Sequence, residues 1–156
     1  MRLSELLNPQ AITTRLRATS KREAIAELVD LLEAAHGIQS QGEVLMRVLN
    51  REATGSTGFM NGIAIPHGKA RALNRMVAAV GIAPQGLAFD SMDGEPTYIV
   101  VLLAGPENIA PLQVKVLANI SRVLKEESVR DELRRAPSAE AFLNSLRLAE
   151  AAQIPS

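Results

Sequence analysis

Apolar and polar residues alternate with a helical period near the start of the chain. Apolar side chains recur every three or four residues at Ile25, Leu28, Val29 and Leu32. Ser20 and Glu23 form a capping box before this stretch, and Gly37 provides a left-handed stop after it. A second box at Ser40 and Glu43 precedes another periodic stretch. We therefore expect a hairpin of two amphipathic helices.

The middle of the chain loses this period. Residues 51–69 contain four glycines and a proline, which predicts a loop with one short strand at Ile63–Ile65. Short apolar runs at 77–82 and 98–103 indicate two further strands. The second run is apolar on both faces, as in a buried central strand. A shorter extended piece around Phe89 is closed by an Asp93-Gly94 turn.

Helical spacing returns at Ala110. One face of this helix carries Val116, Leu117, Ile120, Val123 and Leu124. Ser128, with Asp131, and Ser138 are expected to begin two more helices. Helices, strands and helices follow one another without a long linker, which predicts one α/β domain over residues 1–150, with a mixed sheet flanked by helices. The tail, Ala151–Ser156, is expected to fray.

Composition narrows the classes of function. Seventeen basic residues balance seventeen acidic ones, which argues against a DNA or RNA partner. No cysteine is present, so disulfides, thiolate metal sites and thiol catalysis are excluded. No signal pattern or apolar run long enough to span a membrane occurs. We expect a cytoplasmic protein without membrane insertion.

Two histidines are the candidates for chemistry. His36 precedes Gly37 at a helix end, where a cation is favourable, and this favours a structural role. His67 lies between Pro66, which restricts the backbone, and Gly68, which has no side chain and leaves space beside the ring. Spacing alone more often indicates a structural histidine than a catalytic one. Two distant histidines without cysteine do not favour zinc, and no Gly-x-Ser-x-Gly elbow supports a hydrolase.

The segments around His67 change this balance. Arg51-Glu52-Ala53, Ser56-Thr57-Gly58 and the run from Asn61 to Lys69, NGIAIPHGK, resemble the signature of the EIIA components of the bacterial phosphotransferase system. The resemblance is to the fructose/mannitol class and especially to its nitrogen-regulatory branch, and it spans nearly the whole chain. It implies the mannitol-type EIIA fold, a single α/β domain, and no cofactor or metal.

The resemblance also implies roles for individual residues. His67 would accept a phosphoryl group, on Nε2 as in the family, from the phosphohistidine of an HPr-type carrier. Arg51 matches the arginine beside the active histidine, whose planar fork grips phosphoryl oxygens. Ser56 and Thr57 would either donate hydroxyls to the phosphoryl group or hold the loop. Gly68 is expected to serve backbone geometry.

One position departs from the family pattern. Many relatives carry a second histidine early in the helix that follows the central strand, and alignment puts Gln113 in its place. Glutamine exchanges hydrogen bonds but does not titrate. We expect Gln113 near the phosphoryl site, with a solvated residue on the outer face of its helix as the alternative.

Three functions remain open. The first is a nitrogen-regulatory EIIA whose two phosphorylation states bind regulatory targets differently. The second is a sugar-specific EIIA that passes its phosphoryl group to a fructose- or mannitol-type EIIB. The third is a binding module that has lost transfer, which Arg51 and His67 together argue against.

Overall fold

One mixed β-sheet organises the chain. The structure, a computed structural model, describes residues 1–155. In chain order the elements are the 3-10 helices η1 (Leu3–Leu6) and η2 (Pro9–Ala11), then β1 (Ile12–Thr13), α1 (Lys21–His36), α2 (Glu43–Ala53), β2 (Ile63–Ala64), β3 (His67–Lys69), β4 (Val77–Leu87), β5 (Thr97–Gly105), α3 (Ala110–Leu124), α4 (Glu127–Arg134) and α5 (Ala139–Gln153).

Strand β5 is the centre of this sheet. It pairs antiparallel with β4, with Val80 opposite Val101. On its other side it pairs in parallel with β2 and β3, while β1 pairs in parallel with β4. All residues of β5 except Tyr98 are buried. The prediction of a buried central strand is therefore confirmed.

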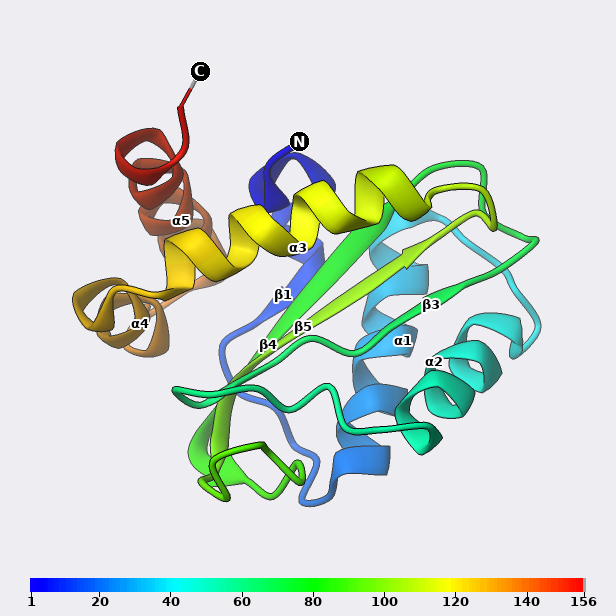
Figure 1. The fold of residues 1–156 in the computed structure, drawn as a ribbon, viewed down its shortest axis with the longest axis horizontal. Helices are drawn as coiled ribbons and strands as arrows, with labels where there is room; N and C mark the ends of the chain where they lie inside the picture. Colours follow the sequence, from blue (N-terminus) through cyan, green and yellow to red (C-terminus); the bar gives the residue numbers. More distant parts are fainter. Residues whose placement is uncertain (156) are drawn as a thin grey trace.

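Helices cover both faces of the sheet. Figure 1 shows α3 crossing the near face and α1 lying behind the sheet. Helix α1 packs on β4, and α2 packs on β3. The core between these layers is almost entirely aliphatic, with Phe89 and Phe142 as its two fully buried aromatic side chains. The expected α/β domain with a mixed sheet between helices is confirmed.

Several predicted helix boundaries are confirmed. The Ser20 hydroxyl accepts from the Glu23 N–H at 3.2 Å, and Gly37 ends α1 with φ of 66°. Ser138 caps α5 by accepting from the Ala141 N–H at 3.1 Å. Helix α5 continues to Gln153, three residues into the segment that was expected to fray. Ser156 lies outside the described residues, and the domain boundary at residue 150 stays a prediction.

The second predicted capping box is wrong. Helix α2 starts after Gly42, whose φ of 87° suits glycine. The Ser40 hydroxyl does accept from the Val44 N–H. The Glu43 carboxylate, however, accepts from the backbone N–H groups of Arg71 and Ala72. A partner distant in sequence has replaced the local one.

One other predicted helix start is also wrong. Helix α4 already includes Glu127, so Ser128 lies inside the helix and does not cap it. Phe89 belongs to no strand; its buried side chain comes from the connection between β4 and β5. Between residues 1 and 155, no helix is long and apolar enough to cross a membrane.

Candidate functional site

His67 lies on a strand, where the sequence predicted a loop. Strand β3 pairs with the C-terminal part of β5, with His67 opposite Leu103. A Cβ atom on Gly68 would come within 3.0 Å of the Val48 backbone nitrogen, so Gly68 faces α2 at close range. Because successive residues of a strand point to opposite faces, His67 points away from α2.

A cavity of about 250 Å³ opens beside the imidazole. It is lined by Arg51, Ser56, Thr57, Gly58, Phe59, Ile65, His67, Met92, Leu117 and Ser121. Phe59 and Met92 are 44% and 74% exposed, so the cavity opens at the protein surface. Four of the predicted site residues, those numbered 51, 56, 57 and 67, therefore share one cavity.

The hydrogen bond of the His67 ring shows which ring nitrogen keeps a free lone pair. Nδ1 lies 2.8 Å from the Ile65 carbonyl oxygen. A carbonyl only accepts, so Nδ1 carries the proton and donates it. In the neutral ring Nε2 then holds a lone pair. This geometry supplies a nucleophile at Nε2.

The surroundings of His67 favour the neutral ring. Burial lowers the pKa of His67, and the cations of Arg51 and Lys69 lower it further. The hydrogen bond to Ile65 and the charge of Glu52 oppose this shift without cancelling it. A neutral imidazole at pH 7 keeps its lone pair available for attack.

Arg51 stands in the last turn of α2 and is exposed. Its Nη1 donates to the Gly55 carbonyl at 2.8 Å and lies 3.5 Å from the Thr54 hydroxyl. These contacts hold one edge of the guanidinium group. The group carries five N–H donors in all, which leaves donors for an anion in the cavity.

The two hydroxyl groups predicted beside the site are engaged with protein atoms. Ser56 donates to the Phe89 carbonyl at 2.6 Å, and Thr57 donates to Glu52 at 2.5 Å. In this structure both side chains therefore hold the loop, which is one of the two roles expected for them. Gly58 lies against the same Phe89 carbonyl, because a Cβ atom at position 58 would come within 2.7 Å of that oxygen.

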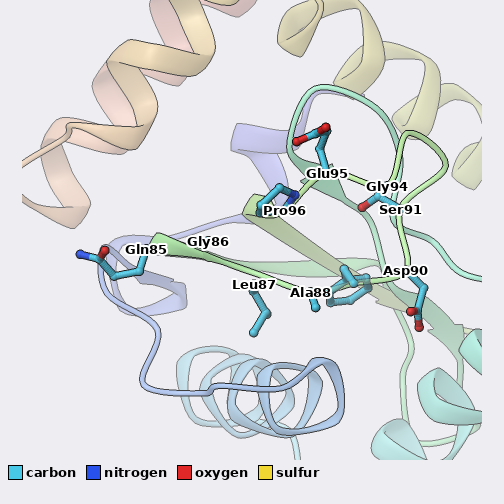
Figure 2. A pocket seen from close by; sticks show the side chains of 10 residues that line it. Gln85, Gly86, Leu87, Ala88, Asp90, Ser91, Gly94, Glu95 and Pro96 are labelled. Carbon is cyan, nitrogen blue, oxygen red and sulfur yellow. The ribbon is translucent and has the colours of Figure 1, made fainter.

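Phe89 belongs to a loop with a cavity of its own. Residues 85–91 and 94–96 line about 410 Å³ of space at the end of the β4–β5 hairpin (Figure 2). This cavity is larger than the one beside His67. None of the predicted site residues lines it. This loop contributes one group to the site beside His67: the Phe89 carbonyl, which accepts from the Ser56 hydroxyl.

Sequence reasoning missed a buried ion pair behind the site. Glu52 is 7% exposed, and its carboxylate lies 2.7 Å from the Lys21 ammonium nitrogen. Burial raises the pKa of Glu52, but hydrogen bonds from Lys21 and Thr57 outweigh burial, so the net pKa is lowered. The one hint in the sequence was that Glu52 directly follows Arg51 in the motif. The sequence pattern places Lys21 at the start of a helix and gives no sign of this ion pair.

Gln113 and His36 lie outside the cavity. Gln113 is partly buried, four and eight residues before Leu117 and Ser121, and so on the same face of α3. It is not among the lining residues, and its nearness to a phosphoryl group stays a prediction.

His36 ends α1 and contacts the Ala78 carbonyl through Nε2 at 2.9 Å. Among residues 1–155, no cluster of three or more potential metal ligands occurs.

Comparisons with known proteins agree on one family. Residues 5–148 match the family described as the phosphoenolpyruvate-dependent sugar phosphotransferase system, EIIA 2. A nitrogen regulatory protein of Bradyrhizobium diazoefficiens is 34% identical over 95% of this chain and 96% of its own length. A fructose-specific EIIABC component of Bacillus subtilis is 31% identical over 91% of this chain but only 23% of its own length. The crystal structure of nitrogen regulatory protein IIA-Ntr from Neisseria meningitidis superposes with a TM-score of 0.83 at 28% identity, covering 92% of this chain and 97% of that one.

Proposed function

The chain belongs to the EIIA 2 family of the phosphoenolpyruvate-dependent sugar phosphotransferase system, and on this basis we propose that it is a nitrogen-regulatory phosphocarrier phosphorylated on His67. The observation that carries the proposal is the pairing of a free Nε2 lone pair with the Arg51 guanidinium in one surface cavity. A nucleophile and an anion-binding group are the two components that phosphoryl transfer requires.

The transfer step moves one phosphoryl group between two imidazoles. The Nε2 lone pair of His67 forms a bond to phosphorus while the P–N bond of the donor breaks, and the bonding pair returns to the donor nitrogen. The proton on Nδ1 of His67 stays on that nitrogen throughout, donated to the Ile65 carbonyl. Because the ring is already neutral, no proton has to leave before attack.

Arg51 stabilises the charge of this step. The transition state of phosphoryl transfer is loose, and its charge lies on the equatorial oxygens. A planar guanidinium binds two such oxygens at once, which an ammonium group cannot do. Its bond to the Gly55 carbonyl orients the fork before the donor arrives, so little reorganisation accompanies the reaction.

The rim of the cavity suits a protein donor. Phe59, Met60 and Met92 are exposed apolar side chains on the loops beside His67. Exposed apolar side chains that cluster on a surface often mark a protein-binding site. We place the phosphohistidine of a small HPr-type carrier against this rim, in the cytoplasm where such carriers act.

A sugar-specific role is the second candidate. It would hand the phosphoryl group to an EIIB, as a fructose-specific relative that covers most of this chain suggests. That relative extends far beyond the part matched here, whereas the nitrogen regulatory relative matches along nearly its full length. The regulatory role is therefore better supported. A binding-only module would not need Arg51 and His67 in one cavity.

The test is reconstitution of the phosphorylation chain. The protein is incubated with phosphoenolpyruvate, Enzyme I and an HPr-type carrier, and its intact mass is followed. A gain of one phosphoryl group that disappears in acid, as phosphohistidine does, supports the proposal. An unchanged mass, with the carrier itself phosphorylated, refutes it. Rapid loss of the group to a fructose-type EIIB would favour the sugar-specific role.

A further inference from the structure

We propose that Glu52, held by Lys21, is a positioning residue that fixes the tautomer of His67 through Thr57 and Ile65. Hydrogen bonds connect these residues in one unbroken series, which starts on α1 and ends at the imidazole. The role in transfer rests on the function proposed above. The effect on the tautomer concerns the unphosphorylated protein and does not depend on that function.

The first part of the series anchors the loop. The buried Glu52 carboxylate accepts from the Thr57 N–H at 2.8 Å and from the Thr57 hydroxyl at 2.5 Å. Lys21 provides the third donor at 2.7 Å. A buried carboxylate is tolerated when such donors replace water. The Glu52 carboxylate, on α2, thus holds Thr57 at two atoms and is itself bound by Lys21 on α1.

The second part carries this order to the histidine. Residues 57–59 run antiparallel to residues 63–65: the Ile65 N–H donates to the Thr57 carbonyl at 3.1 Å, and the Phe59 N–H donates to the Ile63 carbonyl at 2.7 Å. The Ile65 carbonyl then accepts from Nδ1 of His67. The Ile65 carbonyl, which selects the tautomer, therefore belongs to a short antiparallel pair of segments. The opposite segment is bound to Glu52 through Thr57.

Charge adds to this geometric effect. The charged groups around His67 are Arg51 and Glu52 on α2, Lys69 on β3 and, behind Glu52, Lys21 on α1. The face of α3 that lines the cavity contributes the uncharged residues Leu117 and Ser121. Among residues 1–155, Glu52 is the anion whose charge raises the pKa of His67 against the effect of these cations. Its neutralisation should lower the pKa of His67.

The primary test replaces Glu52 by Gln, with Glu43→Gln as the matched control. Glu43 also lies on α2 and accepts two backbone N–H groups, but those belong to Arg71 and Ala72, outside the series. Nitrogen chemical shifts of the His67 ring, measured by NMR above its pKa, report the tautomer. We expect Glu52→Gln to increase the Nε2–H tautomer and to slow phosphoryl transfer on the order of tenfold, as loss of a partner that orients a histidine does elsewhere. Glu43→Gln should leave both unchanged.

Two further pairs guard against a variant that fails to fold. Thr57→Val removes the hydroxyl link and Thr57→Ser keeps it; Lys21→Met removes the cation and Lys21→Arg keeps it. We expect the first member of each pair to shift the tautomer and the second to restore it. A wild-type tautomer in folded Glu52→Gln and Thr57→Val, or equal effects of Glu52→Gln and Glu43→Gln, overturns the proposal. Absence of any phosphorylation in the wild type, with the tautomer shift present, overturns only the function above.

Discussion

Replacement of Gly68 by Ala tests the close packing between strand β3, which carries His67, and helix α2, which carries Arg51. A methyl group there would lie 3.0 Å from both the Val48 backbone nitrogen and its Cγ2 atom, and 3.2 Å from the Arg47 carbonyl carbon. Two of these three atoms are backbone, so a rotamer change cannot relieve the contact. Helix α2 has to move away from β3 by a few tenths of an ångström.

The expected cost follows from overpacking. Extra methyl groups in a packed interior usually cost about 1–3 kcal/mol of unfolding free energy. For a domain of this length, a loss of about 2 kcal/mol lowers Tm by roughly 4–8 °C. Transfer should fall as well, because the movement of α2 displaces Arg51 relative to His67, and catalysis is sensitive to such displacements.

Thermal unfolding and the initial transfer rate are the assays, with Gly94→Ala as the control. Gly94 has open space around it but a φ of 73°, so alanine there is strained without pushing on α2. It should lower Tm and leave transfer unchanged. A Gly68→Ala protein that unfolds at the wild-type temperature would refute the packing argument.

Three other changes have defined outcomes. Arg51→Lys should slow transfer on the order of 100-fold with Tm unchanged, because an ammonium group cannot bind two phosphoryl oxygens; equal rates in a transfer assay would leave Arg51 as a mere helix end. Because the pKa of His67 is lowered, its ring stays neutral as pH falls through 6.5 and gains a proton only at lower pH. The form that can accept a phosphoryl group therefore persists at pH 6.5. An NMR titration of the ring with a midpoint above 6.5 would contradict this. Gln113→His should add an inflection between about pH 5 and 8 to the pH–rate profile, since an imidazole titrates there. Superimposable profiles for the wild type, Gln113→His and Gln113→Ala would show that this position takes no part in the chemistry.

Patterns of local origin were predictable from the sequence. The helix starts at Ser20 and Ser138 follow from side-chain caps within three residues, and the buried strand β5 follows from its continuous apolar run. These features depend on neighbours in the chain. Ser40 and Glu43 show the limit of such reasoning, because Glu43 binds backbone groups of residues 71 and 72 that only the fold brings near.

The site was predictable in its members but not in its connections. The motif predicted Arg51 and His67 together, and both line one cavity, while their roles in transfer stay predictions. Strand β3 was missed because His-Gly-Lys has no apolar pattern. This segment is a strand because it pairs with β5, which is distant in the sequence. The burial of Glu52 was also not predictable, since a carboxylate in the last turn of an amphipathic helix is usually solvated. Its partner Lys21 is 31 positions away in the chain.

The most direct measurement is the site of phosphorylation. Wild type, His67→Ala and His36→Ala are incubated with phosphoenolpyruvate, Enzyme I and an HPr-type carrier, and each is followed by intact mass and mapped by fragmentation. The cavity, the free Nε2 and Arg51 lie at His67, whereas His36 contacts the backbone of β4 at the end of α1. We expect wild type and His36→Ala to gain one phosphoryl group at equal rates and His67→Ala to gain none. Phosphorylation of His67→Ala at the normal rate, or its loss in His36→Ala, would contradict the account.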